Sequence, residues 1–485
     1  MSWLSSTMEK LRGWVMSILP VQDIFKQMGV SPQSSDGMPQ LVEVWRTTYQ
    51  GNPPYLKSDD KSLHFPTVIS RDLAKKSIGE LAVVASLPSG GERSVNHEDT
   101  QRIIDKEILP YLRDQVEYGL AMGGVVARPW FDGKRVRIGW YTADMALPIA
   151  WDGKDLTGVV LIDRITKKIA DRKTYYTKLE AIKPFDGGWI ITTKLYRSEA
   201  EASLGVWVPL TAIPQWEDIS PEVVITGDVC PFAYMATPWA NNKDLGSPQG
   251  TSIFANAMDG CLEELDRTYT NLSWEIEAGK SKVFIDDSMV AIDPKTGKDQ
   301  LDPLERKLYR KVSSIEGKDL LEPYSPELRI DQFNAALKTQ LSIACMLCHL
   351  DSGAYVYDQA ANAITATEVR TKQQQTYGTI VDVQDQMISP FITDLVDSFR
   401  AIQILYKLGG MIPLDILIGI DYGDSVLVDE ETDRTNAQSE VTAGLRSKLS
   451  YLMEYRGMNE VEALKEIERI KAEAPVYTSF FDTGA

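Results

Sequence analysis

Three segments in the second half of the chain carry apolar residues at helical spacing. In residues 251–277, and in the segment that opens at residues 325–326, apolar side chains recur every three or four positions, which predicts two amphipathic helices. The second should begin with Ser325 as its N-cap, followed by Pro326, and should end near Leu350. The aligned apolar positions are Met258, Leu262, Leu265, Tyr269, Leu272 and Ile276 in the first helix, and Ile330, Phe333, Leu337, Leu341 and Ala344 in the second. The first helix should expose its acidic residues, Asp259, Glu263, Glu264, Asp266 and Glu275, on its other faces.

The third segment, residues 365–408, predicts a helix of roughly forty residues that would span about 60 Å. Pro390 lies inside it, and because proline lacks an amide hydrogen and clashes with the preceding turn, we expect a kink there rather than an end. The apolar stripe continues on both sides of the proline through Ile380, Val383, Met387, Phe391, Leu395, Phe399 and Ile402. Such periodicity is typical of helical bundles and coiled coils. The segments between the helices argue against a simple bundle.

Those intervening segments have different characters. Residues 282–321 predict short strands around turns, at 282–285, 289–292 and 310–315, so the first two helices should carry a small β-containing module between them. Residues 351–364 are too polar to bury and too few to form a domain. They predict a loop that is presented to a partner.

The rest of the chain mixes helices and strands. Helices are predicted over residues 71–87 and 96–122, followed by strands at 135–140, 159–162, 174–177, 189–192 and 206–208, with Asp-Gly turns at residues 132, 152 and 186. One or two strands are expected over 413–428, and the acidic residues 429–433 should begin a helix. The last helix should open with a capping box of Asn459 and Glu462 and stop at Pro475. The predicted fold class is therefore α+β.

Composition narrows the possible functions. A chain of 485 residues with 43% hydrophobic content is globular and can form several packed layers or two to three domains. A net charge of −18 argues against a surface that grips nucleic acid throughout. It is compatible with an acidic channel along which a duplex slides, although solubility alone explains any single carboxylate equally well.

Leader, membrane and disulfide signals are weak in this sequence. The four cysteines, without a secretory leader, predict a reducing cytoplasm and no disulfide framework. No stretch approaches the length of a membrane span. Residues 14–19 predict an amphipathic helix that packs on the body or contacts a neighbouring subunit.

One motif suggests chemistry. Cys345-Met-Leu-Cys348-His349 has the spacing of a c-type haem attachment site, which would support a redox or hydrolytic enzyme. Because the motif ends an apolar helix, two thiols in or near a core are the favoured interpretation. The three histidines are scattered, which disfavours a zinc site, and Gly279-Lys280-Ser281 lacks the first glycine of a P-loop.

Several short motifs occur in an informative order: residues 45–51 (WRTTYQG), 231–234 (PFAY), 241–242 (NN), 247–252 (SPQGTS), 365–369 (TATEV), 424–430 (DSVLVDE), 443–445 (AGL) and 457–463 (GMNEVEA). In order and spacing they resemble the portal proteins of tailed bacteriophages, in the branch typical of phages with long non-contractile tails. By position, the resemblance implies a wing over residues 1–249, stem helices over 250–280 and 325–350, a clip over 281–324, a tunnel loop over 351–364, a long kinked wing helix over 365–408, wing strands over 409–430 and a helical crown over 431–485.

The same resemblance implies a function. Twelve subunits would form a ring at one capsid vertex of the virion, assembled in the host cytoplasm, through which double-stranded DNA is packaged and ejected. No catalysis, cofactor or metal is expected. The clip would dock the terminase large subunit and later a head-tail adaptor, and the ring would also meet scaffold and major capsid protein. Another structural protein of the capsid is the remaining alternative, which the presence or absence of a ring with a central hole would separate.

Two groups of candidate site residues follow. The loop residues expected nearest DNA are Tyr355, Tyr357, Gln359 and Asn362, and their alternative role is packing against a neighbouring subunit. The basic residues of the insert, expected to meet an acidic partner or DNA, are Arg306, Lys307, Arg310 and Lys311. A solvated charge run paired with nearby acidic residues explains this second group equally well.

Overall fold

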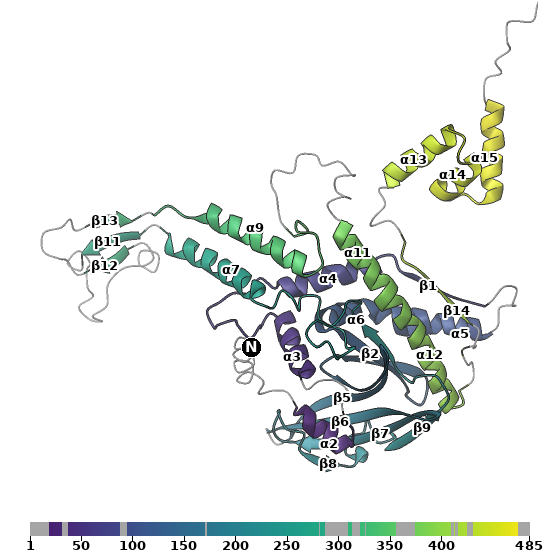
Figure 1. The fold of residues 1–485 in the computed structure, drawn as a ribbon, viewed down its shortest axis with the longest axis horizontal. Coiled ribbons are helices and arrows are strands. Elements are labelled where there is room, and N and C mark those ends of the chain that lie inside the picture. The colour runs from purple at the N-terminus through teal and green to yellow at the C-terminus, as the bar shows by residue number, and fades with distance from the viewer. Residues whose placement is uncertain are drawn as a thin grey trace, which may run out of the picture. The chain divides into compact units, whose positions relative to one another are not determined.

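The computed structural model describes residues 19–31, 37–87, 95–169, 172–280, 282–286, 309–312, 321–324, 326–355, 374–408, 412, 416–423 and 430–473. These residues form both helices and strands, so the predicted α+β class is confirmed (Figure 1). The chain divides into two units. One comprises Met1–Ala363 and Thr371–Asp421, and the other comprises Ile364–Arg370 and Tyr422–Ala485.

The first unit opens with a series of helices. It contains α2 (Val21–Met28), α3 (Met38–Tyr49), α4 (Phe65–Ile78), α5 (Val95–Ile103), the π-helical turn η1 (Ile104–Ile108) and α6 (Leu109–Met122). Helix α6 contacts both α3 and α4. Its buried side is apolar, with Leu112, Val116 and Leu120 fully buried. The predicted helix over residues 96–122 is thus present, with a π turn inside it.

An antiparallel sheet forms the largest β element. Its strands β4 (Ala146–Asp152), β5 (Asp155–Ile169), β6 (Arg172–Phe185), β7 (Gly188–Ser198) and β8 (Val206–Val208) follow one another in order, and β9 (Glu222–Thr226) also pairs with β7. The predicted Asp-Gly turns close two of its hairpins, because Gly153 and Gly187 adopt the positive φ angles of 62° and 100° that glycine tolerates. The predicted strands at 159–162, 174–177, 189–192 and 206–208 all lie in this sheet. The short 3₁₀ helix η2 (Leu210–Ala212) follows it.

A second sheet has three strands in the order β10-β2-β3, from β2 (Gly124–Phe131), β3 (Val136–Thr142) and β10 (Ala233–Ala236). Helices α6 and α12 both contact it. The first six residues of β2 are buried without alternation. A strand covered on both faces lacks the period of two that reveals a strand in a sequence, which explains why β2 was not predicted.

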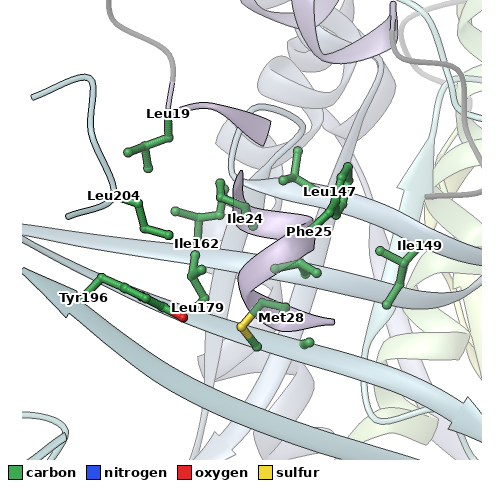
Figure 2. Packing of buried hydrophobic residues seen from close by; sticks show 12 residues of the cluster. Leu19, Ile24, Phe25, Met28, Leu147, Ile149, Ile162, Leu179, Tyr196 and Leu204 are labelled. Atoms are coloured by element: carbon green, nitrogen blue, oxygen red, sulfur yellow. The ribbon is translucent and has the colours of Figure 1, made fainter. Parts of the chain in front are cut away.

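Helix α2 covers part of the large sheet (Figure 2). Its buried residues Ile24, Phe25 and Met28 pack among apolar side chains of β4, β5, β6 and β7. Two lysines of the sheet cap its C-terminal end. Lys183 donates to the carbonyls of Met28 and Gly29, at 3.3 and 3.2 Å, and Lys194 donates to that of Gln27 at 2.6 Å. Each cation at the C-terminus of a helix stabilises that helix by about 0.5 kcal/mol. The predicted helix at residues 14–19 lies almost wholly outside the described residues.

The two predicted amphipathic helices are α7 (Cys261–Ala278) and α9 (Ile330–Leu347), which pack on each other (Figure 1). Both predicted starts were wrong. Residues 253–260 form turns that end at Gly260, whose φ of 102° terminates them before α7 begins. Helix α9 begins at Ile330, and the predicted capping residue Ser325 lies outside the described residues.

Between α7 and α9 lies a three-stranded sheet in the order β12-β11-β13, with β11 (Lys282–Asp286), β12 (Tyr309–Val312) and β13 (Leu321–Tyr324). The β-containing insert is therefore present. The predicted strand at 289–292 lies outside the described residues. The predicted strand at 310–315 coincides with β12 over residues 310–312.

The long third helix appears as α11 (Gln374–Val383), the π turn η4 (Gln384–Ile388) and α12 (Ser389–Leu405). All seven residues of its predicted apolar stripe are buried, none more than 3% exposed. Pro390 is the second residue of α12, just after the π turn η4, and Pro110 is likewise the second residue of α6, just after η1. In each case the turn closes with an i−5 bond, from the amide of Ser389 to Gln384 and from that of Leu109 to Ile104. The wider turn passes the proline without ending the helix, as predicted.

One predicted helix was wrong at its end. Helix α4 stops at Ile78, and residues predicted to continue it form β1 (Ala82–Ser86). This strand pairs antiparallel with β14 (Leu417–Asp421), which lies within the predicted strand region 413–428. The partner is more than three hundred residues away in the sequence, so local periodicity could not reveal the pairing.

The second unit is helical and contains α13 (Glu430–Thr442), α14 (Lys448–Arg456) and α15 (Glu460–Glu473). The predicted capping box opens α15, because Asn459 accepts the amide of Glu462 at 2.9 Å and Glu462 accepts that of Asn459 at 3.2 Å. Among the described side chains of this unit, the fully buried ones include Ala437 and Ala463.

Candidate functional site: the junction that joins α7, α9 and α11 to the body

The first motif of the sequence, residues 45–51, fastens α3 to its neighbours. Trp45 is 1% exposed, and Tyr49 donates its hydroxyl to Glu117 of α6 at 2.6 Å. Burial raises the pKa of Tyr49, and Glu117 raises it further, so this hydroxyl stays protonated. Gly51 closes the motif with a φ of 81°, and a Cβ there would lie 2.0 Å from the imidazole of His64. Only glycine fits at this position.

The second group of motifs, between residues 231 and 252, forms a close crossing of two chain segments. A Cβ at Gly250 would lie 2.0 Å from the carbonyl oxygen of Gly123, and a Cβ at Gly123 would lie 2.4 Å from that of Gly250. Around this contact, the Thr237 hydroxyl donates to the Thr251 carbonyl at 2.8 Å and accepts the Thr251 amide at 2.9 Å. Asn241 donates to the carbonyl of Gln249 at 3.0 Å. The motif residues are therefore packing residues that bring the chain from β10 to α7.

The carboxylate of Asp266 connects helix α7 to the segment from Tyr55 to Leu63, although the sequence pattern places Asp266 outside the apolar stripe of the helix. Asp266 is only 5% exposed, and accepts the Tyr55 hydroxyl at 3.0 Å and the Leu63 amide at 2.7 Å. Burial raises the pKa of Asp266, which these hydrogen bonds oppose. The expectation that Asp266 faces solvent was wrong, because the segment from Tyr55 to Leu63 covers this side of the helix.

Glu275 also contradicts the expected exposure. It is 8% exposed and accepts two guanidinium bonds from Arg329, at 3.0 and 2.7 Å. The paired hydrogen bonds of Arg329 lower the pKa of Glu275. This fork joins the end of α7 to the start of α9, at the base of the three-stranded sheet.

The cysteine-histidine motif lies at the end of α9, as expected, and its thiols are buried. Cys345 and Cys348 are both 0% exposed, and burial raises the pKa of each. His349 adopts a φ of 60° and stacks its ring on Trp239 with centroids 5.3 Å apart. Burial lowers the pKa of His349. In the described part of the chain, no group of three or more His, Cys, Asp or Glu residues could hold a metal ion. Packing is the role that this geometry supports.

Of the four predicted loop residues, the described one is Tyr355. Its hydroxyl donates to Asp72 of α4 at 2.7 Å, and its ring meets that of Phe65 edge-on at 5.8 Å. Burial and the neighbouring Asp72 raise the pKa of Tyr355. Tyr355 thus packs on its own chain at the start of the predicted loop. Tyr357, Gln359 and Asn362 lie outside the described residues.

The predicted basic group is described only in part. Arg310 and Lys311 occupy consecutive positions of β12, opposite Phe284 and Ile285 of the parallel strand β11. Arg306 and Lys307 lie outside the described residues. The partner-docking role of all four residues stays a prediction.

A set of contacts between the end of α9 and the start of α11 was not predicted from the sequence. The carboxylate of Asp351 accepts the amides of Gln375 and Thr376, at 3.3 and 2.9 Å, and the Asp351 amide donates to the Thr376 hydroxyl at 3.0 Å. The signal was faint, because an aspartate that caps a helix is usually found directly before it.

No helix among the described residues is both long enough and apolar enough to cross a membrane.

Comparison with known proteins adds one match. Residues 95–475 match the model of a protein family described as "Phage portal protein, SPP1 Gp6-like". The matched range begins with α5 and includes α7, α9, α11 and the described helices α13, α14 and α15 of the second unit. No curated protein matches this chain.

Proposed function

Because this chain belongs to the phage portal proteins, a structural family, we propose that its copies form a ring at one vertex of a phage capsid and that double-stranded DNA is packaged and ejected through it. The family match covers most of the chain and carries this proposal. A ring of identical subunits requires two complementary surfaces on each copy.

The order of elements along the chain supports the proposal. Helices α7 and α9 pack together, and the three-stranded sheet lies between them in the sequence. This is the order stem, clip, stem that the sequence motifs imply. The Asp266 contacts hold α7 to the body, and the Glu275–Arg329 fork holds the two helices together where they meet the sheet.

We assign the following parts to the ring as proposals. Twelve copies assemble, with α7 and α9 as the stem, the strands β11, β12 and β13 as the clip, and residues 351–364 as the tunnel loop. The clip docks the terminase large subunit during packaging and a head-tail adaptor afterwards. Scaffold and major capsid protein surround the ring. The ring assembles in the host cytoplasm and becomes part of the virion.

The proposed contacts with DNA and partners involve residues named from the sequence. Tyr357, Gln359 and Asn362 of the loop meet the duplex, while Tyr355 holds the start of the loop on α4. The basic group of the clip, from Arg306 to Lys311, meets an acidic partner. The net charge of −18 suits a channel wall that does not bind the sliding duplex.

Negative-stain electron microscopy of the purified full chain tests this proposal. Class averages should show rings of about twelve subunits around an open hole, consistent with closed cyclic symmetry. Monomers or dimers at every concentration, with scaffold protein present, would refute it. Compact closed particles without a hole would instead favour another structural protein of the capsid.

A second experiment addresses the loop. Alanine at Tyr357, Gln359 and Asn362 together should leave the rings intact and reduce the amount of DNA that complemented phage heads retain. The matched control is the triple alanine variant of Gln215, Glu217 and Asp218, exposed residues that lie outside the proposed stem, clip and loop. Loss of the rings in the loop variant alone would place these residues at a subunit contact instead of beside DNA.

A further inference from the structure

The chain leaves the end of α9 and returns to the start of α11 at one place. On the outgoing side lie His349 and Asp351, and on the returning side lie Gln375, Thr376 and Thr379. Four hydrogen bonds join the two sides. Three involve Asp351, and in the fourth Thr379 donates its hydroxyl to the carbonyl of His349 at 2.5 Å. Thr376 and Thr379 are 8% and 7% exposed, so these bonds are shielded from water.

The bonds of Asp351 have the chemistry of a capping box whose two halves are far apart in the sequence. The first amides of a helix have no partner within the helix, and a carboxylate there satisfies them and interacts favourably with the helix dipole. In an ordinary capping box the acceptor directly precedes the helix, and the residue at the third helical position bonds back. Here the acceptor lies 24 positions upstream of Gln375, and Thr376 supplies the return contact.

Because Asp351 is distant from α11 in the sequence, its hydrogen bonds cap the helix and also join two separate segments of the chain. Breaking the cap removes the partners of two α11 amides, and it leaves the bond between Thr379 and His349 as the remaining hydrogen bond of this group between the two sides. Tyr355 forms a separate attachment, because its hydroxyl binds Asp72, which also pairs with Lys76 of α4 at 2.8 Å. Helix α4 contacts α11 as well, so the outgoing and returning ends share one support.

We infer that Asp351 is a positioning residue that fixes the end of α9 to the start of α11, so that the two described chain ends flanking residues 356–373, a stretch that includes most of the proposed tunnel loop, are held at one place. This inference rests on the proposed function for its consequence. The contacts of Asp351 are independent of that function. Asp351 touches neither DNA nor a partner in this role, and it acts through Thr376 and Gln375.

Hydrogen exchange of the assembled full-length protein tests the contacts. Asp351→Ala should speed the exchange of the Gln375 and Thr376 amides about tenfold, the usual effect of losing an N-cap. Asp351→Asn keeps one acceptor oxygen and should recover part of the protection. Asp385→Asn, which changes an exposed carboxylate of the adjacent π turn, is the matched control and should leave both amides unchanged. Equal exchange in Asp351→Ala and the unchanged protein would overturn the inference, and so would an Asn variant as fast as the Ala variant.

Phage complementation then tests the consequence. Asp351→Ala should assemble rings of normal size but package or retain at least twofold less DNA, and Thr376→Val should show the same split. Normal DNA retention in heads that contain Asp351→Ala rings would overturn the positioning role even if exchange increases. If the unchanged chain forms no rings, the proposed function fails, while the exchange result still judges the contacts of Asp351.

Discussion

The ion pair between Arg128 of β2 and Glu180 of β6 joins the sheet β10-β2-β3 to the six-stranded sheet, and its removal tests how much this contact contributes to stability. Arg128 Nε lies 2.9 Å from Glu180 Oε1, and both side chains are about one-tenth exposed. Arg128 also donates to the carbonyl of Pro231 at 3.3 Å, in the segment that leads into β10. Lys178 lies 4.0 Å from the second oxygen of Glu180 and binds Asp163 at 2.7 Å. We predict that Arg128→Met strongly destabilises this region.

The magnitude follows from the burial of both partners. Burial alone would raise the pKa of Glu180, but the charges of Arg128 and Lys178 hold it below its ordinary value. Removing one partner of a buried pair leaves an uncompensated charge and costs about 3–5 kcal/mol. Lys178 is too distant to replace the direct bond. Adding Glu180→Leu to Arg128→Met should return most of this loss, because an apolar pair of similar volume is often neutral.

Hydrogen exchange of β6 amides measures the local free energy of opening. Exchange should accelerate about a hundredfold or more in Arg128→Met, since each 1.4 kcal/mol is about a factor of ten. Arg137→Met removes an ion pair with Asp132 in which the arginine is 43% exposed, and it should change exchange little.

The pH dependence of this loss is a second readout. A carboxyl group whose pKa is lower in the folded than in the unfolded protein stabilises the fold at pH values above its unfolded-state pKa. This stabilisation is lost as the pH falls through its folded-state pKa. In Arg128→Met only Lys178 still opposes the effect of burial, so the pKa of Glu180 rises relative to the unchanged protein and its cost falls when it protonates. The gap between the two proteins should therefore narrow from pH 7 towards pH 4. A loss below about 1 kcal/mol, or one that is the same at both pH values, would refute the argument.

Three further predictions concern the junction and the titrating groups. Gly250→Ala should prevent the crossing at Gly123 and cause insoluble expression, whereas Gly353→Ala, where a Cβ meets no atom within 4 Å, should express normally; equal solubility would contradict this. Burial raises the pKa of all four cysteine thiols, that of Cys230 to about 12. A thiol reagent at pH 8 should therefore label the folded protein slowly, and should label four sites in urea. Fast labelling of two or more sites in the folded protein would contradict this prediction. Burial and neighbouring carboxylates raise the pKa of Asp394 to about 6, which costs stability as the pH rises from about 4 to 6. Asp394→Asn should therefore raise the melting temperature slightly at pH 7 and not at pH 3.5, and a variant that melts lower at pH 7 would refute this.

The long helix shows what periodicity alone can predict. Every residue of its predicted stripe is buried, and the helix continues past Pro390, as predicted, with a π turn just before it. Both follow from local rules, because the spacing of apolar residues sets the buried face and the proline ring sets where the turn must widen. The capping box of α15 and the Asp-Gly turns are local in the same sense.

The contacts at the junction show what periodicity leaves out. Asp266 and Glu275 lie on what the pattern makes a solvent face of α7, yet Tyr55, Leu63 and Arg329 cover them. Strand β1 depends on a partner more than three hundred residues away, and β2 is covered on both faces.

The sequence by itself determined the α+β class, the helical stripes and the turns, because each of these depends on residues close together in the chain. It also determined the order of motifs that resembles portal proteins, because that order can be read without knowing any contact. Only the tertiary structure decided which carboxylates are buried and that Asp351 caps α11 across 24 positions. A polar side chain can cap a helix or link two segments only when folding brings an unsatisfied hydrogen-bond donor to it. That donor can lie anywhere in the chain.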